Sequence, residues 1–179
     1  MLRIVSTIAT LQEHLEKLAG TPQDYRPKQC PRCGLSGLWG HGHYDRKADR
    51  DPGTLNPIPI PRFFCRGCHR TCSRLPSCIA PRRWYLWSVQ QAVLMSLLSG
   101  ISLDECATKW AHLGPAPSTM RRWWRWLRTR HELFSFYLRT HQPEWGRAVQ
   151  WREFWQLAMQ DEPLRELMAS LDGQGLSVP

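Results

Sequence analysis

The chain has 179 residues, and its hydrophobic content of 42% is typical of a protein that folds around a core, which excludes a disordered tail. No apolar run is long enough to cross a bilayer, and the opening residues MLRIVSTIATLQEHLEK lack the long apolar segment of a secretory signal. We therefore expect a cytoplasmic protein, whose thiols are kept reduced. The net charge of +9 is concentrated in the middle of the chain: residues 26–75 hold ten basic and three acidic groups, residues 76–130 hold eight and two, and both ends are slightly acidic.

Residues 1–25 are predicted to form one short amphipathic helix followed by a linker. Apolar side chains recur at helical spacing over residues 8–19. Thr10 and Glu13 have the spacing of a capping box, and Gly20 lies where the helix should end. We expect this helix to pack against the core or a partner, with no chemistry of its own.

Residues 26–80 are predicted to form a small sheet of three strands. The candidate strands are GLWGHGHYDRK, IPIPRFF and RTCSRLP, and the turn-rich segment ADRDPGTLNP joins the first two. Because proline has no N–H to donate, the two prolines of IPIPRFF predict that this strand lies at an edge of the sheet.

Two C-x-x-C pairs flank the predicted hairpin, Cys30 with Cys33 and Cys65 with Cys68. Each pair has a glycine in or directly after its turn, which favours a tight knuckle whose backbone amides point at the thiolates. Two such knuckles bring four sulfurs together as a tetrahedron, the arrangement of a structural Zn2+ ion. With four protein ligands no coordination position stays open for water, and we expect the metal to stabilise a sheet too small to bury a sufficient core.

Two alternatives to zinc remain open on these residues. Redox C-x-x-C pairs normally lie in a βαβ context, which this region lacks, whereas an iron–sulfur cluster also takes four cysteines. Nearby histidines, His41, His43 and His69, offer substitute ligands, but the set of four cysteines is already complete. Cys72 is interpreted as a buried residue of the third strand, and Cys78 and Cys106 as small buried residues.

Residues 81–142 are predicted to form a helix-turn-helix domain. Its first helix covers about 82–98, its second about 103–112, and its third starts after Pro117. Ser102 and Glu105 form a second capping box, LGPAP is the turn, and Ser118 is the predicted N-cap of the third helix.

The third helix combines an apolar side with a basic side. This pattern is typical of a recognition helix in the major groove of double-stranded DNA, and the planar guanidinium of arginine suits phosphate. A basic helix on the surface of a bundle or a membrane is the competing interpretation. The candidate DNA contacts are Thr119, Arg121, Arg122, Arg125 and Arg128 on this helix, Arg82 and Arg83 at the start of the first, and Arg62, Arg66 and Arg70 in the sheet region.

Tryptophan is unusually frequent, with ten residues. Helical spacing assigns most of them to the core, and Trp126, nearest the arginine side, is the best candidate for stacking on an unpaired base. Residues 143–179 are predicted to form acidic helices that complete the core or bind a protein partner.

The segments CPRCG, HGHYDR, IPIPRFFCRGCHRTCSRLP, PRRWY and GISLDECA together resemble a known bacterial build. They are similar to the zinc-ribbon plus helix-turn-helix segment of insertion-sequence transposases, and to small stand-alone proteins of that build that accompany mobile-element integrases. The resemblance covers roughly residues 28–130. It implies DNA binding at element ends or regulation of the element, a transposase or integrase as partner of the C-terminal helices, and Cys30, Cys33, Cys65 and Cys68 as metal ligands.

The chain is not expected to be an enzyme. A transposase core needs a separate α/β domain with three acidic residues around two metal ions, and the residues after Arg130 are predicted to be helical. We therefore expect an α+β protein in which a three-stranded zinc ribbon precedes an all-α helix-turn-helix domain. The predicted function is a sequence-specific, nucleoid-associated DNA-binding accessory or regulatory protein of a mobile element. The alternatives are a transcriptional regulator unrelated to transposition and a zinc-stabilised protein-interaction adaptor.

Overall fold

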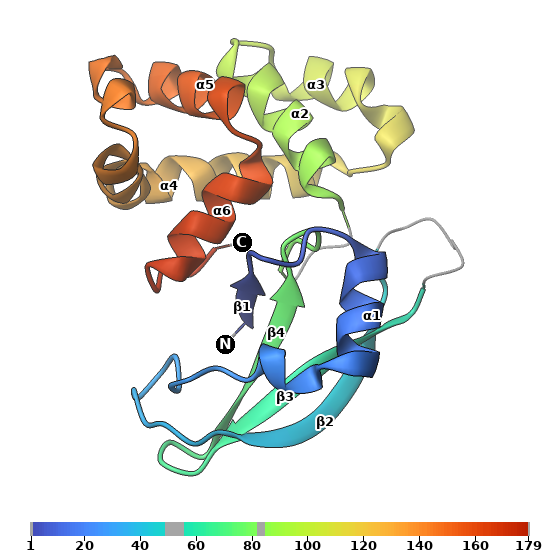
Figure 1. Ribbon diagram of the computed structural model, residues 1–179. Helices are drawn as coiled ribbons and strands as arrows, with labels where there is room; N and C mark the ends of the chain where they lie inside the picture. Colours follow the sequence, from blue (N-terminus) through green and yellow to red (C-terminus); the bar gives the residue numbers. More distant parts are fainter. Residues whose placement is uncertain (1, 49–55, 82–84, 179) are drawn as a thin grey trace. The chain divides into compact units, whose positions relative to one another are not determined.

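The computed structural model describes residues 2–48, 56–81 and 85–178 (Figure 1). In these residues the fold is α+β, with a four-stranded mixed sheet and six α-helices. The chain divides into two compact units, Met1–Trp84 with the sheet and Tyr85–Pro179 with five of the helices. No helix of the described residues is long and apolar enough to span a membrane.

The sheet of the first unit has four strands, so the prediction of three was wrong. Their order is β1-β4-β3-β2, with β1 parallel to β4 and the other neighbours antiparallel. The missed strand is β1, which runs beside β4 in Figure 1 and pairs from Leu2↔Ser73 to Val5↔Pro76. The strand bounds are Leu2–Val5 for β1, Trp39–Arg46 for β2, Ile58–Cys65 for β3 and Arg70–Pro76 for β4.

The proline-containing strand β3 lies inside the sheet, between β2 and β4, which corrects its prediction as an edge strand. Its pairing with β2 runs from Ile58 to Phe64, whereas its register with β4 covers only Arg62–Cys65. Pro59 and Pro61 therefore lie in the half of the strand whose register involves β2 alone. Proline is tolerated there because no second neighbouring strand requires its missing N–H.

The helix predicted over residues 8–19 is α1 (Leu11–Gly20), which begins three residues later, directly after Thr10, the N-cap of its confirmed capping box with Glu13. The helix is joined to the sheet by His14, which is fully buried. Its Nδ1 lies 2.6 Å from the Tyr25 hydroxyl and its Nε2 lies 2.8 Å from the carbonyl oxygen of Pro59. A neutral ring protonated at Nε2 satisfies both contacts, so this helix is anchored to β3 through a buried hydrogen-bond chain.

Two groups of buried side chains form the core of the first unit. One contains three cysteines of the sheet region, and the other lies among the isoleucines of β3. The first group comprises Val5, Ile8, Tyr25, Cys30, Leu38, Phe63, Cys65 and Cys72, and the second comprises Ala48, Ile58, Ile60, Leu75 and Ile79. This core exceeds what a three-stranded ribbon alone would bury.

The second unit is helical, and α2, α3 and α4 follow the predicted helix-turn-helix order. The helices are α2 (Trp87–Leu98), α3 (Leu103–Lys109), α4 (Pro117–His141), α5 (Trp151–Asp161) and α6 (Leu164–Gly173). Helices α2 and α3 both pack on α4, and α5 and α6 pack on α2. The acidic C-terminal segment, predicted either to complete the core or to bind a partner, therefore completes the helical core.

In the second unit three helix boundaries differ from prediction. Helix α2 begins at Trp87 rather than near residue 82, and Arg82 and Arg83 lie outside the described residues. Helix α3 ends at Lys109, before a short 3-10 turn. Ala116 rather than Ser118 occupies the N-cap of α4, because Pro117 takes the first helical position, where its missing N–H costs nothing.

Candidate functional site

The first knuckle is a tight turn that starts at Cys30. The Cys30 N–H donates to the carbonyl of Leu35 at 2.8 Å, and the Gly34 N–H donates to the carbonyl of Cys30 at 2.9 Å. Gly34 has φ of +75°, a left-handed conformation that glycine adopts without steric cost. The turn thereby returns the chain sharply enough for Cys30 and Cys33 to face the same point.

The second knuckle joins β3 to β4. Cys65 is the last residue of β3, Cys68 follows in the turn, and His69 adopts φ of +52° directly after it. A Cβ on Gly67 would lie 2.8 Å from Cδ2 of Leu35 and 3.7 Å from Sγ of Cys33. The missing side chain of Gly67 therefore lets the two knuckles approach each other.

The four cysteines meet as one cluster, and all four sulfurs lie within 4.8 Å of one another. Sγ of Cys30 is 3.7 Å from Sγ of Cys68, and Sγ of Cys33 is 3.5 Å from Sγ of Cys65. Sulfurs bound about 2.3 Å from a tetrahedral zinc ion lie about 3.8 Å apart, so this spacing fits a four-thiolate centre. The cluster can hold one metal ion.

The thiols of the cluster interact electrostatically. Burial disfavours the Cys30 thiolate, but the backbone amides of Cys33 and Arg32 and the neighbouring thiols outweigh it and lower the Cys30 pKa to about 7. At Cys33 the Leu35 amide favours the thiolate, yet the Cys65 thiol, burial and the thiols of Cys30 and Cys68 together outweigh this amide and raise the pKa to about 11. Without a cation the cluster thus favours one thiolate over several, whereas a bound divalent cation stabilises all of them together.

The other predicted candidates for ligation lie apart from this cluster in the described chain. The ring of His41 contacts Phe64 with centroids 5.9 Å apart, and the ring of His69 contacts the same phenylalanine at 6.2 Å. Cys72 is buried in the core, with 5% of its surface exposed. The cluster found among the described residues contains four cysteines and no histidine.

The arginines predicted on the third helix share the exposed side of α4. Arg121, Arg122, Arg125 and Arg128 are all exposed, and Thr119 accepts a 3.4 Å hydrogen bond from Arg122. The opposite side of α4 is the core of the helical unit, formed by Met120, Trp123, Leu127, His131, Phe134, Ser135 and Leu138. The helix is therefore divided into a buried apolar side and a basic surface.

The arginines of the sheet region occupy three different environments. Arg62 donates to the Thr71 hydroxyl at 3.4 Å, and the guanidinium carbon of Arg66 lies 4.1 Å from the centroid of the exposed Trp39 ring. Arg70, at the start of β4, lines a cavity beside the four-cysteine cluster together with Arg32. Arg32 was missed by the sequence reasoning, although its position between two predicted ligands was a usable signal.

The tryptophan proposed for base stacking is partly occupied by other contacts. Trp126 is half-buried, and its ring packs on Phe134 with centroids 5.3 Å apart. Trp124 packs on Trp151 at 5.0 Å, with the Arg152 guanidinium 5.6 Å from the Trp124 ring. Both tryptophans therefore already pack on other aromatic rings.

Fold and site together define an α+β protein with a four-cysteine centre and a basic helical surface. The chain belongs to the DUF6431 family, a domain of unknown function whose sequence model matches residues 30–123. The match begins at Cys30, includes all four clustered cysteines and extends to Trp123 in α4. No curated protein and no solved structure matches the chain.

Proposed function

We propose that the protein binds double-stranded DNA through α4 and acts as an accessory or regulatory protein of a mobile element. The observation that carries the proposal is the row of four exposed arginines on the side of α4 opposite its buried residues. The helix is the third of a helix-turn-helix order, the position from which a recognition helix enters the major groove.

The charge on α4 is available to a ligand. Within the described chain, Arg121, Arg125 and Arg128 make no salt bridge and no side-chain hydrogen bond. An arginine without a protein partner retains its five donors for phosphate oxygens or guanine edges. Sequence specificity is proposed to come from the arginines nearest the N-terminus of α4, and the remaining ones would contact the backbone.

The metal is proposed to be one structural Zn2+ ion. Four thiolates are the donor set that zinc takes in closed structural sites, and the sulfur spacing suits a tetrahedron. When bound, the ion holds the two knuckles together and leaves no position for a substrate. Its role is then to fix the surface around the β3–β4 turn.

The assignment to a mobile element rests on the resemblance of residues 28–130 to transposase DNA-binding segments. In this proposal a separate transposase or integrase supplies catalysis, and the chain contributes recognition in the cytoplasm. A transcriptional regulator would have the same biochemistry. A protein-interaction adaptor is supported by one observation: Phe136 and Leu133 on α4 are 64% and 40% exposed.

Binding of short duplexes, followed by fluorescence anisotropy at increasing salt, tests the proposal. The logarithm of affinity should fall with the logarithm of salt by about 0.9 for each phosphate contacted. Arg121→Ala and Arg125→Ala should each weaken binding by about tenfold. Arg147→Ala is the matched control, because Arg147 is exposed on the same unit but pairs with Glu144 at 2.9 Å.

Two outcomes would refute the assignment. If Arg147→Ala weakens binding as much as Arg121→Ala, the effect is general charge and α4 is not the recognition helix. If no duplex binds at low salt and a protein partner binds through Phe136, the adaptor function replaces the DNA-binding one. Selection of bound sequences from a random pool then separates specific from general binding.

A further inference from the structure

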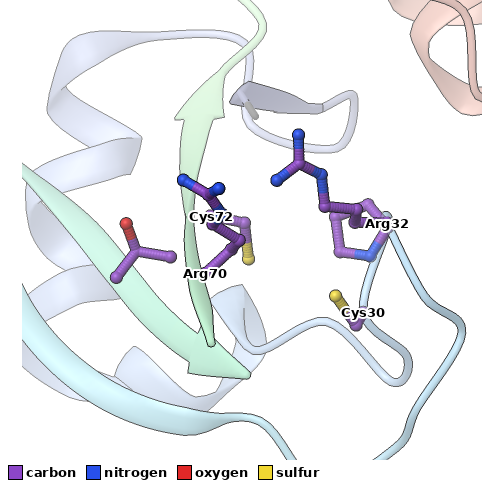
Figure 2. A pocket seen from close by; sticks show the side chains of 6 residues that line it. Cys30, Arg32, Arg70 and Cys72 are labelled. Atoms are coloured by element: carbon purple, nitrogen blue, oxygen red, sulfur yellow. The ribbon is translucent and has the colours of Figure 1, made fainter. Parts of the chain in front are cut away.

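A cavity of about 280 Å3 lies directly beside the metal cluster. It is lined by Cys30, Pro31, Arg32, Arg70, Thr71 and Cys72, shown in Figure 2. The two guanidinium groups lie on one side of this pocket, and the sulfurs of Cys30 and Cys72 lie on the other. No acidic side chain is among these lining residues, so the cavity has the chemistry of an anion site.

Both arginines are free to bind a ligand. Arg32 and Arg70 are exposed, and neither guanidinium has a hydrogen bond or ion pair to the described residues. Thr71, between Arg70 and Cys72 on β4, also lines the cavity, and its hydroxyl oxygen accepts from Arg62 at 3.4 Å. Two planar forks that line one cavity match the oxygens of a tetrahedral phosphate group.

The metal cluster fixes the spacing of the two arginines. The backbone amide of Arg32 donates to the Cys30 sulfur, and the backbone amide of Arg70 donates to the Cys68 sulfur. Those two sulfurs lie 3.7 Å apart. Each arginine thus supports a metal ligand with its main chain and lines the cavity with its side chain.

We propose that the Arg32–Arg70 cavity holds one backbone phosphate of the bound DNA. This inference rests on the proposed DNA-binding function and adds to it a second contact, located in the first unit and independent of α4. The phosphate would bridge the two knuckles by contacting both arginines. In this arrangement both arginines contact the same phosphate, whereas two separate surface contacts would each bind a different phosphate.

A double-mutant cycle on the full, zinc-loaded chain tests the shared phosphate. Arg32→Ala and Arg70→Ala should each reduce duplex affinity about tenfold and lower the salt slope by about 0.9. The double variant should lower the slope by about 0.9 as well, rather than twice that amount, because only one phosphate is lost. Arg66→Ala is the control partner: the Arg66 and Arg70 effects should add, since Arg66 lies against Trp39 instead.

A second measurement identifies the source of the phosphate. In 15N-labelled protein, duplex DNA should shift the Nε–Hε resonances of Arg32 and Arg70, and inorganic phosphate should compete for the same resonances. Duplex binding that is unchanged in Arg32→Ala and Arg70→Ala, yet lost in Arg121→Ala, overturns this inference and leaves the proposed function intact. Absence of duplex binding by the wild type, with saturable shifts from inorganic phosphate, overturns both the DNA assignment and the proposed function.

Discussion

Cys68→Ala and Cys72→Ala form a matched pair that tests the assignment of the metal ligands. Both residues follow Cys65 closely in sequence, but only Cys68 lies in the four-sulfur cluster, 3.7 Å from Cys30. Cys72 is buried in the core of the sheet and belongs to no ligand set among the described residues. The same chemical change therefore removes a ligand at one position and a core atom at the other.

The expected magnitudes differ by mechanism. Changes that only reorient a ligand cost about 10–100-fold in metal affinity, so loss of a ligand in Cys68→Ala should cost at least about 100-fold, or about 2.8 kcal/mol. Cys72→Ala should retain one zinc per chain and lose about 1 kcal/mol of stability, the value for one buried group of that size. Cys68→His should recover part of the affinity, because imidazole is also a zinc ligand.

Metal content is measured by elemental analysis of purified protein, and affinity by competition with a chromophoric chelator. Cys33→Ala serves as a second ligand variant, because Cys33 is exposed and its loss leaves the apolar core unchanged. Equal losses of zinc affinity in Cys72→Ala and Cys68→Ala would refute the assignment of Cys68 as a ligand and Cys72 as a core residue. Folded wild-type protein without any metal would refute the metal centre itself.

The other expected effects concern stability and are measured by chemical denaturation. Tyr25→Phe removes the hydroxyl 2.6 Å from Nδ1 of buried His14 and should lower the free energy of unfolding by about 1–3 kcal/mol, the penalty of an unsatisfied buried group. An unchanged free energy of unfolding would mean that water replaces the hydroxyl. Burial lowers the pKa of His14 below 6.5, so the unfolded chain binds this proton more strongly and the free energy of unfolding should decrease as pH falls below 6.5. Equal losses of stability in the wild type and His14→Gln from pH 7 to 5 would contradict this expectation. Ser102→Ala removes the hydroxyl that accepts from the Glu105 N–H at 3.2 Å and should lower the free energy of unfolding by about 1 kcal/mol. An equal loss in Ser99→Ala would indicate a general effect of replacing serine instead of loss of the cap.

Features encoded by nearby residues were predictable from the sequence. Both capping boxes are correct because a cap involves side chains and amides only three residues apart, as with Thr10 and Glu13. The meeting of the four cysteines was also predictable, since C-x-x-C spacing limits each pair to one knuckle. The strand β4 was predicted with its observed bounds because its alternating pattern lies between a turn and a proline.

Features that depend on distant residues were not predictable in the same way. β1 is too short to show a period, and its partner β4 lies about seventy residues further along the chain. The location of β3 inside the sheet depends on a register that stops at Arg62, which no local pattern encodes. The Arg32–Arg70 cavity likewise exists only once the two knuckles have met.

The buried core changes the role that a bound metal would have. The sequence suggested a sheet too small to fold without zinc, yet α1 and β1 enlarge the first unit and bury residues such as Ile8 and Val5. The isoleucines Ile58 and Ile60 lie in a separate group that contains no clustered cysteine, so their packing does not depend directly on the ion. A bound metal would then act chiefly at the two knuckles, which its ligands join. Because Arg32 lies in one knuckle and Arg70 follows the other, such an ion would stabilise the part of the first unit that presents these two arginines.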